Sequence, residues 1–434
     1  MLISSKFFDI NHLNELSRFS QITGNSLHVL SEKNKSIEKF ANISTDILLV
    51  RDTEILSGLD DIKNQYDLII ITDLFELTDD IYGFLKKIKK HLNIDGKLLI
   101  TSVNTKWNSI IKIFEKLNIK TKTSNRSYIQ PNKISNIARS CGYELITHYS
   151  RQIFPFKLLG VGKIINICLE LLLKFFNLGI KNYMIFNFYH EEKKSLSKSI
   201  IIPAKNEEKN LVPLVERIPK FNDRYELIII YGESKDNTEK IANSLTNIFP
   251  DIDIKVSKQS GKGKANAVWE GVKIASNELI AILDSDISVD PETLLDFFEI
   301  IENGNADFVN GTRLIYPMED EAMRVLNTYG NKLFQFLISL VIGQKLTDSL
   351  CGTKVFKRKN LVKLNYWQNL LKSNDPFGDF DLIFSTAYSG DKILEYPVHY
   401  RARVYGETQI SRFKDGYKLI KYFLESFYLF NISK

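Results

Sequence analysis

Cysteine is scarce in this chain, which has only three among its 434 residues. Cys141, Cys168 and Cys351 stand far apart, and this spacing excludes both a framework of disulfides and a zinc site made from paired cysteines. The six histidines are equally scattered and form no HExxH motif. We therefore expect neither a disulfide-stabilised fold nor a histidine-based zinc centre.

Long apolar runs are missing as well. A membrane-spanning helix needs about 20 mainly apolar residues, but the best candidate, residues 158–180, contains Lys163, Glu170 and Lys174. The uncharged run at residues 333–344 has only 12 residues, and the start of the chain lacks the apolar core of a signal peptide. We expect no membrane span, and a surface association stays open because both runs are flanked by lysines.

Charge is nearly balanced, and the composition is that of a globular protein. The 58 Lys+Arg and 52 Asp+Glu residues leave a formal net charge of +6, and 44% of the residues are hydrophobic. This composition excludes wholesale disorder, and we expect no nucleic-acid partner. At about 150 residues per domain, the length predicts two or three domains.

The first half of the chain alternates strand signals with helix signals. One segment, residues 81–92, has apolar residues at helical spacing. The predicted strands lie at residues 26–30, 46–50, 67–71, 97–103 and 182–189. Such a series implies a doubly wound α/β sheet.

A polar stretch without apolar periodicity, residues 190–198, precedes a second series of the same kind. Its predicted strands lie at residues 199–203, 226–230, 279–283, 308–310 and 393–396. We therefore predict two doubly wound α/β domains, residues 1–192 and 199–434, joined by a linker at 193–198. The second domain ends in an amphipathic, aromatic-rich helix near residues 417–430.

Two carboxylates, Asp284 and Asp286, come directly after the apolar strand at 279–283. At positions i and i+2 of a strand end they can face one divalent cation. Mg²⁺ and Mn²⁺ prefer such hard oxygen ligands and leave room for phosphate oxygens. A DxD pair on its own is explained as well by a solvated turn, so its neighbours decide the interpretation.

Three further segments place polar residues at strand ends or helix starts. A turn with Asn206 and Glu207 follows the strand at 199–203, at the edge where open α/β sheets bind ligands. Asp236 lies in a turn that resembles a helix N-cap. The Gly-Lys-Gly-Lys loop at 261–264 opens a helix and could meet a diphosphate.

Together and in this order, these segments resemble glycosyltransferase family 2 with its GT-A fold, in the branch of polyprenyl-phosphate sugar synthases. The likeness runs from Ser199 to about Phe423 and includes motifs at residues 308–313, 316–324, 347–354, 375–381 and 401–408. The resemblance implies an inverting enzyme that uses a nucleotide-sugar donor, Mg²⁺ or Mn²⁺, and a lipid-phosphate or glycan acceptor. It implies a cytoplasmic protein, and peripheral contact with the inner face of the membrane stays open.

The same resemblance implies a role for each matching residue. Asp286 would ligate the metal, and Asp284 would hold the metal or the ribose. Asp379 and Asp381 match the motif that supplies the acceptor-side carboxylate, which acts as a base for a sugar hydroxyl but is not required for a lipid phosphate. The loop residues would contact the nucleotide or its phosphates: Pro203, Ala204, Asn206, Glu207, Asp236, Lys262 and Lys264. Arg401, Arg403 and Arg412 could neutralise the donor diphosphate or an acceptor phosphate, and a basic solvated face stays open as the alternative for this group.

Two positions depart from the family pattern. Tyr231 stands where the family often has paired acidic residues, and we expect its ring to stack on the nucleotide base. Gln409 stands where the polyprenyl-phosphate branch often has a lysine, which weakens the case for a lipid-phosphate acceptor.

Residues 25–190 look like the later strands of a class I S-adenosylmethionine methyltransferase, with Asp52 as the counterpart of the acidic residue that contacts adenine. That family needs a glycine-rich turn after its first strand. Here no glycine occurs between Leu30 and Gly58. We interpret this half as a degenerate methyltransferase-like Rossmann domain that does not bind the cofactor. A scaffold, acceptor-recognition or regulatory role stays open.

Three other functions remain as alternatives. A nucleotidyltransferase would need a glycine-rich, basic signature that residues 199–210 lack. A non-catalytic nucleotide-sugar-binding or scaffold protein is disfavoured by the intact DxD pair and the motif at 375–381. A methyltransferase with an accessory second half is disfavoured by the missing glycine turn.

Overall fold

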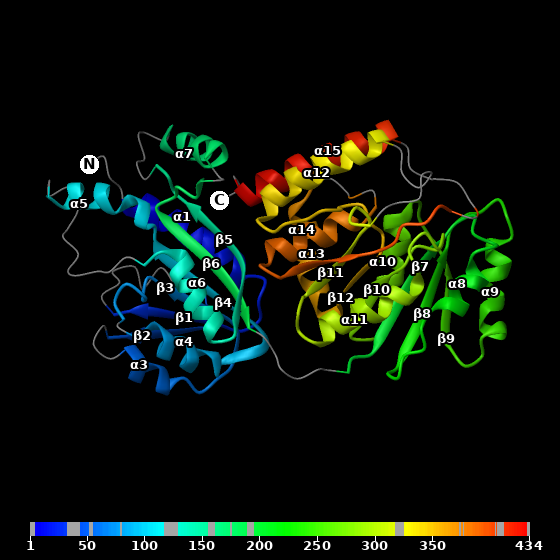
Figure 1. Ribbon diagram of the computed structural model, residues 1–434, viewed down its shortest axis with the longest axis horizontal. Helices are drawn as coiled ribbons and strands as arrows, with labels where there is room; N and C mark the ends of the chain where they lie inside the picture. Colours follow the sequence, from blue (N-terminus) through cyan, green and yellow to red (C-terminus); the bar gives the residue numbers. More distant parts are fainter. Residues whose placement is uncertain are drawn as a thin grey trace. The chain divides into compact units, whose positions relative to one another are not determined.

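The computed structural model describes residues 5–32, 44–51, 55–78, 80–116, 129–154, 161–173, 176–188, 195–316, 325–372, 375, 377–403, 405 and 412–431. The chain divides into two compact units, within Met1–Tyr189 and His190–Phe430. Each unit is built around one sheet with helices packed against it (Figure 1). The predicted α/β class, with two mainly parallel sheets, is confirmed.

The first unit contains a six-stranded sheet in the order β2-β1-β3-β4-β6-β5. Its strands are β1 (Ser26–Ser31), β2 (Asp46–Val50), β3 (Tyr66–Thr72), β4 (Leu92–Val103), β5 (Tyr143–Arg151) and β6 (Lys181–Phe188). The strands from β2 to β4 pair in parallel, and β6 runs antiparallel between β4 and β5. The chain order reverses at β1 and β3, which makes their carboxyl ends the topological switch point of this sheet.

Alternating apolar side chains of β3 explain why this sheet is covered on both faces. Ile69 and Ile71 pack in a core with Phe84 and Leu85 of α4 (Ile81–Lys89). Leu68 and Ile70 point to the opposite face, where they pack with Leu16 and Phe19 of α1 (Ser5–Ser20). The other helices of this unit are α3 (Ile55–Gly58), α5 (Asn108–Lys116), α6 (Pro131–Ser140) and α7 (Val161–Leu172).

The second unit contains a seven-stranded sheet in the order β13-β11-β12-β10-β7-β8-β9. Its strands are β7 (Lys198–Ala204), β8 (Tyr225–Tyr231), β9 (Asp253–Lys258), β10 (Leu279–Ile282), β11 (Phe308–Thr312), β12 (Lys354–Lys357) and β13 (Ile393–Pro397). Only β12 runs antiparallel to its neighbours, β10 and β11. The chain order reverses between β7 and β10, so their carboxyl ends form a second switch point.

Helices cover both faces of this sheet too. Ile200 and Ile202 of β7 share a core with α8 (Leu211–Arg217), α9 (Thr238–Ile248) and α11 (Leu294–Glu302). On the other face α10 (Lys264–Ile274) approaches so closely that a side chain at Gly271 would overlap Ile201. The remaining helices are α12 (Val325–Ile342), α13 (Leu361–Leu370), α14 (Asp379–Tyr388) and α15 (Arg412–Asn431).

The structure corrects several predicted boundaries. α4 ends at Lys89 and β4 already begins at Leu92, so the helix predicted at 81–92 is too long. β5, β9 and β12 were not predicted. β5 and β9 are edge strands, in which polar side chains interrupt the apolar run, and β12 has only four residues, of which two are lysines.

The predicted linker, residues 193–198, is only partly described. β7 begins at Lys198, whose buried ammonium pairs with Asp223 and Glu302. The last residue of the predicted linker is thus part of a strand, and the domain limits stay a prediction. None of the helices in the described part of the chain combines the length and the apolar content of a membrane-spanning segment.

Candidate active site

Carboxylates gather at the carboxyl ends of β7, β8 and β10. The turn with Asn206 and Glu207 follows β7, Asp236 follows β8, and Asp284 and Asp286 follow β10. Because these three strands are parallel neighbours, their carboxyl ends meet at one edge of the sheet. This edge is the switch point, where open α/β sheets bind their ligands.

The turns after β7 and β8 are joined by hydrogen bonds. The amide of Asn206 donates to Ser234 Oγ at 3.1 Å, and the amide of Lys235 donates to Asn206 Oδ1 at 2.7 Å. The amide of Glu207 donates to Thr238 Oγ1 at 2.8 Å. Asn206 adopts a φ of 57°, a left-handed conformation that asparagine tolerates. These hydrogen bonds hold the two turns together, so they form one continuous side of the site.

Asp236 and Tyr231 are held within this side of the site. One oxygen of Asp236 accepts the amide of Thr238, and the other accepts the amide of Glu208. The Tyr231 ring is 8% exposed and belongs to the core, while its hydroxyl donates to Glu239 at 3.0 Å. Contacts with the nucleotide, including stacking of Tyr231 on the base, stay predictions for both residues.

Pro203, Ala204 and Lys262 lie around the same edge. The carbonyl of Pro203 accepts Ser285 Oγ at 2.9 Å, and the carbonyl of Ala204 accepts the amide of Gly232 at 2.9 Å. These bonds tie β7 to both neighbouring loops. Lys262 is exposed in the loop before α10, where its ammonium can reach solvent or a ligand.

Each carboxylate of the DxD pair faces a cation. Asp284 Oδ1 lies 2.6 Å from Lys264 Nζ, and Asp286 Oδ2 lies 2.7 Å from Arg403 Nε. Burial alone would raise the pKa of Asp284, but Lys264, with smaller effects of Lys354 and Arg403, lowers it below its ordinary value. Burial also acts to lower the pKa of Lys264, but Asp284 raises it overall.

Glu207 adds a third carboxyl group to this region. Burial raises its pKa to about 7, and the charges of Asp286 and Asp284 act in the same direction. No three His, Cys, Asp or Glu side chains of the described residues are placed to hold a metal by themselves. The carboxylates of Asp284 and Asp286 are the hard oxygen ligands that a divalent ion prefers, and metal binding here stays a prediction.

Gly352 lies against the pair of Asp284 and Lys264. A Cβ atom added there would overlap Asp284 Oδ2 and approach Lys264 Nζ to 2.5 Å. The sequence motif at 347–354 contains this glycine, but its role was not predicted. Only the fold brings the loop before β12 onto the end of β10.

The three aspartates of the motif 375–381 have different surroundings. Asp375 accepts the amides of Phe377, Phe380 and Asp381 at 2.7–2.9 Å, so it caps the start of α14. Burial, with the charges of Asp381 and Asp379, raises the pKa of Asp375 to about 7. Its position makes it a structural cap of the helix.

Asp381 points toward other helices. Its two oxygens accept Tyr422 Oη of α15 at 2.6 Å and Gln368 Nε2 of α13 at 2.7 Å. Trp367 Nε1 also donates to Tyr422 Oη, at 2.8 Å. Burial raises the pKa of the Asp381 carboxyl. A catalytic role for Asp381 stays a prediction, and these contacts give it a role in joining α13, α14 and α15.

Asp379 is the member of this motif that faces the DxD region. Its Oδ1 lies 3.0 Å from Lys354 Nζ, and its charge helps to raise the pKa of Lys264. Lys354 is fully buried and its ammonium also donates to the carbonyl of Cys351. Lys354 ends the sequence motif at 347–354, but no role was predicted for it. Lys354 lies on β12, between β10 and β11, and pairs with Ile282 at the end of β10. Its buried positive charge therefore lies next to the DxD pair that follows β10.

The arginine candidates are not equivalent. Arg401 forms a two-pronged pair with Asp290, with nitrogen–oxygen distances of 2.9–3.1 Å. Arg403 contacts Asp286 directly. Arg412 begins α15, and its side chain is outside the described residues, as are Asp52 and Gln409. Of the two arginines whose side chains are described, Arg403 is thus the one whose guanidinium is placed at the DxD pair.

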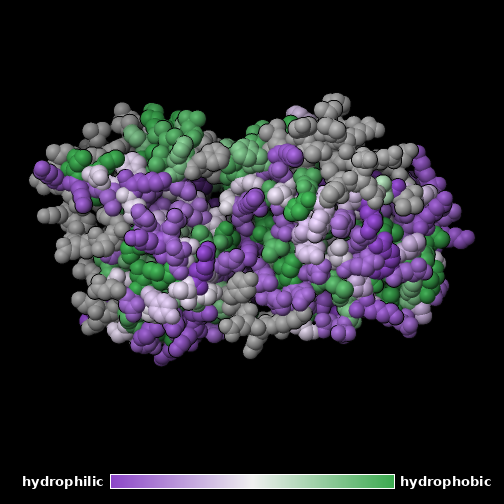
Figure 2. Space-filling model, in the orientation of Figure 1, coloured by the Kyte–Doolittle hydropathy of each residue, from purple (hydrophilic) through white to green (hydrophobic). Residues whose placement is uncertain are grey.

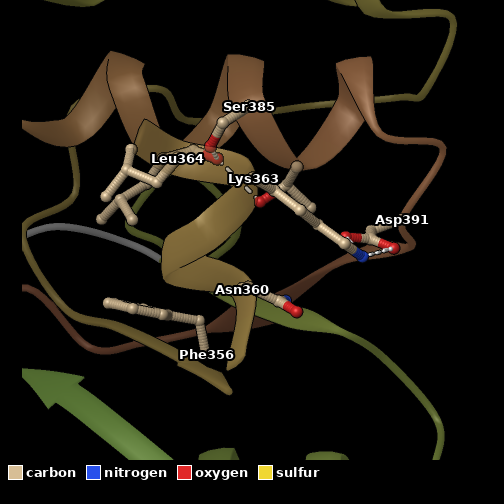
Figure 3. A pocket seen from close by; sticks show the side chains of 8 residues that line it. Phe356, Asn360, Lys363, Leu364, Ser385 and Asp391 are labelled. Atoms are coloured by element: carbon tan, nitrogen blue, oxygen red, sulfur yellow. Dashed lines mark hydrogen bonds and ion pairs between the residues drawn. The ribbon is translucent and has the colours of Figure 1, made fainter. Parts of the chain in front are cut away.

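A small pocket lies elsewhere in the second unit, between α13 and α14 (Figure 3). Lys363 crosses it to pair with Asp391 at 2.6 Å. Its wall also includes Phe356, Asn360, Leu364 and Ser385 but none of the carboxylates described above. This pocket is therefore separate from the candidate active site.

The switch point of the first unit looks different. Asp73, with a φ of 54°, is paired with Lys181 and accepts Thr101 Oγ1 at 3.1 Å. Nearby, His28 Nε2 shares a 2.7 Å hydrogen bond with Thr72 Oγ1, and burial lowers the pKa of His28 to about 3. Several polar side chains at this edge are thus paired with one another, and the absence of cofactor binding stays a prediction.

The sequence comparisons concern the second unit. Residues 199–364 match the family model described as glycosyl transferase family 2. The match runs from β7 into α13 and includes Asp284, Asp286 and Lys354, while the motif at 375–381 lies beyond it. This segment is thus similar to glycosyltransferase family 2, and the predicted class of enzyme, a glycosyltransferase, is confirmed.

Named relatives match the same half of the chain. A dolichyl-phosphate hexose transferase of Haloferax volcanii is 27% identical over 219 residues, which cover 50% of this chain and 88% of that protein. A dolichol-phosphate mannosyltransferase of Pyrococcus furiosus is 34% identical over 220 residues, which cover 49% of this chain and 58% of that protein. The chain thus spans little more than half the length of the second relative.

A solved structure shows a weaker similarity. It is the glucosyl-3-phosphoglycerate synthase of Mycobacterium tuberculosis in complex with Mn²⁺, uridine-diphosphate-glucose and phosphoglyceric acid. It is 18% identical to this chain, with a TM-score of 0.42, over 54% of this chain and 80% of that one. A similarity at this level is too low to place ligands in the present chain.

Proposed function

We propose that the second unit transfers a sugar from a nucleotide-sugar to a polyprenyl phosphate, with inversion at the anomeric carbon. The carrying observation is that Asp284, Asp286 and Asp379 gather at the switch point of a unit similar to glycosyltransferase family 2. The acceptor assignment is supported by two relatives named for dolichyl or dolichol phosphate.

The acceptor chemistry agrees with the surroundings of Asp379. An oxygen of the acceptor phosphate is already anionic, so it can attack the anomeric carbon without losing a proton. One Asp379 oxygen is paired with the buried Lys354, and this contact suits a residue that orients the acceptor. The bond from the sugar to the donor diphosphate breaks as the new bond forms on the opposite face, and the electron pair leaves with the diphosphate.

Asp286 and Asp284 are the residues that would hold Mg²⁺ or Mn²⁺. When bound, the ion would neutralise charge on the leaving diphosphate. Lys264 and Arg403 stand beside these carboxylates and can turn toward the phosphates once the carboxylates have another cation. A guanidinium suits phosphate oxygens because its nitrogens form a planar fork.

The test is transfer to a defined acceptor. The purified chain, a panel of nucleotide-sugars and Mn²⁺ should yield a polyprenyl-phosphate sugar whose anomeric configuration, read by NMR, is opposite to that of the donor. Transfer only to a free glycan would replace the proposed acceptor, and retention would contradict inversion. Donor binding without transfer to any acceptor would favour a non-catalytic nucleotide-sugar-binding protein.

We also propose peripheral contact with the membrane through α15. Four of its apolar side chains, at i, i+3, i+7 and i+11, are 49–71% exposed: Tyr417, Ile420, Leu424 and Tyr428. Lys418 and Lys421 flank them, and lysines near an anionic bilayer contribute about 1 kcal/mol each. Lys418→Glu with Lys421→Glu should weaken flotation with anionic vesicles at low salt. Wild-type protein that stays at the bottom of the gradient would contradict this proposal.

For the first unit we propose a degenerate methyltransferase-like domain without cofactor binding. The missing glycine turn and the paired side chains at its switch point support this. The domain division, residues 1–192 and 199–434, is part of the same proposal. Separate expression of the two parts tests it, because independent domains should each unfold cooperatively.

A further inference from the structure

Helix α7 of the first unit exposes an apolar stripe. Val161, Ile164, Cys168 and Leu172 stand at i, i+3, i+7 and i+11, so they share one face of the helix. Val161 is 53% exposed, Ile164 63% and Leu172 74%, and Cys168 is exposed as well. Phe176, shortly after the helix, is 61% exposed. A contiguous exposed patch of this kind marks an interaction surface.

Helix α5 continues this surface. Its Ile110 and Ile113 are 40% and 55% exposed. The segment at its start contacts the segment after α7, because Trp107 Nε1 donates to the carbonyl of Leu178 at 2.6 Å and Lys106 Nζ donates to that of Phe176 at 2.5 Å. Figure 1 places both helices at the same end of this unit, and Figure 2 shows hydrophobic residues gathered over α7.

The described charges around the patch are mainly positive, and the side chain of Glu115 on α5 lies outside the described residues. The exposed charged side chains described on α5, on α7 and at the start of α5 are all lysines: Lys106, Lys112, Lys116 and Lys163. The acidic Glu170 of α7 has an 11% exposed side chain that is paired with Arg151. Exposed apolar side chains among lysines are the pattern of an element that lies on an anionic bilayer.

The position of the patch in the fold supports an exposed functional surface. α5 follows the carboxyl end of β4, and α7 lies in the connection from β5 to β6. Because β6 is antiparallel to both neighbours, this connection also lies at the carboxyl ends of β4 and β5. That edge is where α/β sheets bind ligands. At the switch point of the same edge, Asp73 is paired with Lys181.

We propose that α5 and α7 form a docking surface for an anionic lipid bilayer, so the first unit itself contacts the membrane. α15 of the second unit has its exposed apolar residues at the same spacing, also beside lysines. A symmetric contact between two copies of the α5–α7 surface would bring lysines against lysines, which is unfavourable. The inference deepens the proposed function, since an acceptor held in a bilayer requires the enzyme to work at that surface.

Vesicle binding of the full chain tests this surface. Phosphatidylcholine vesicles with and without phosphatidylglycerol are titrated with wild type and with Ile164→Glu/Leu172→Glu. The substitutions remove exposed apolar contacts and add negative charge, so binding to the anionic vesicles should weaken by about tenfold or more. Lys112→Glu/Lys116→Glu should weaken anionic binding and flatten its dependence on phosphatidylglycerol.

The matched control is Leu295→Glu/Val362→Glu, at apolar residues of the second unit that are 48% and 69% exposed. This variant should bind vesicles as wild type does, and melting curves should confirm that every variant is folded. Wild-type vesicle binding by the α7 variant would overturn the proposal. So would a wild-type dimer in light scattering that the α7 substitutions dissociate, because a second copy would then cover the face.

Donor binding separates this inference from the proposed function. Calorimetry with nucleotide-sugars should give the same affinity for wild type and the α7 variant. A chain that transfers sugar but has an α7 variant with unchanged vesicle binding would keep its proposed function and lose this surface. A chain that binds vesicles through α7 but transfers nothing would keep the surface and lose the function.

Discussion

The two units have the same kind of sheet edge, but different ion pairs occupy it. In the second unit, acidic side chains at the switch point are opposed by Lys264 and Arg403, which are 26% and 31% exposed. In the first unit, Lys181 at the corresponding edge is 5% exposed and pairs with Asp73, whose side chain is 22% exposed, so the cation is the more buried partner there. Partly exposed ion pairs can exchange their cation for a ligand at small cost, whereas a buried pair loses heavily when one partner is removed. We therefore predict a binding site at the switch point of the second unit and none at that of the first.

The largest expected effect comes from a substitution at the DxD pair of the second unit. Asp286→Ala should abolish metal-dependent nucleotide binding, with a loss of about a hundredfold or more, because a single carboxylate cannot hold the cation and the diphosphate together. Calorimetry with Mn²⁺ and a nucleoside diphosphate measures it. Asp251→Ala, at an exposed aspartate outside the site, is the control. Unchanged affinity in the Asp286 variant would refute the DxD assignment.

The next prediction tests the buried positive charge of Lys354, which pairs with Asp379. Lys354→Met leaves Asp379 without its buried partner, and we expect a loss of about tenfold or more in kcat/KM. Removing one partner of a buried pair also costs about 3–5 kcal/mol of stability. The control is Lys198→Met, which removes a comparably buried ammonium at the start of β7, at the end of that strand away from the candidate site. It should destabilise the fold with little effect on the activity per folded molecule.

A double variant shows whether Lys354 acts through Asp379. In an Asp379→Asn background, Lys354→Met should cost much less activity than in wild type, because the two residues then no longer interact. Equal losses in both backgrounds would mean that Lys354 acts independently of Asp379.

A smaller effect concerns the capping residue of α14. The pKa of Asp375 is raised from 3.8 to about 7 in the folded chain, so the stability it contributes is full below about pH 4 and is lost as the pH rises through about 7. Asp375→Asn has no such proton to lose. The melting temperature of the variant relative to wild type should therefore rise between about pH 5 and pH 8, by about 2–4 °C per kcal/mol.

This pH dependence has a clear counter-result. Asp251→Asn, at an exposed residue, should show a constant difference from wild type over the same range. A constant difference for Asp375→Asn as well would mean that the folded chain does not favour a proton on Asp375.

The last prediction concerns the sheet edge of the first unit, where we expect added cofactor to have no effect on the melting temperature. S-adenosylmethionine at sub-millimolar concentration should cause no saturable shift in the melting temperature of the wild-type chain. The nucleotide-sugar donor with Mn²⁺ is the positive control. A saturable shift with S-adenosylmethionine would show that the first unit binds the cofactor without a glycine turn, and the contrast between the two edges would then disappear.

Local sequence patterns predicted much of this protein. Uninterrupted apolar runs such as those of β3 and β8 identify buried strands because both faces of these sheets are covered. The position of Asp284 and Asp286 after such a run predicts their place at a sheet edge. The order of motifs along the second half predicts a similarity to glycosyltransferase family 2, and residues 199–364 match the model of that family. These features depend on neighbouring residues, which a sequence displays directly.

Tertiary structure alone decided which polar residues meet. Asp379 and Asp381 are two positions apart, yet one faces Lys354 and the other faces Tyr422 of α15. The antiparallel insertion of β12 brings Lys354 beneath the DxD pair, and the loop before it brings Gly352 against Asp284. Such contacts join segments far apart in the chain, and their formation depends on strand order and helix packing. The spacing of residues in the sequence does not determine strand order or helix packing, because many strand orders are compatible with one series of strands and helices.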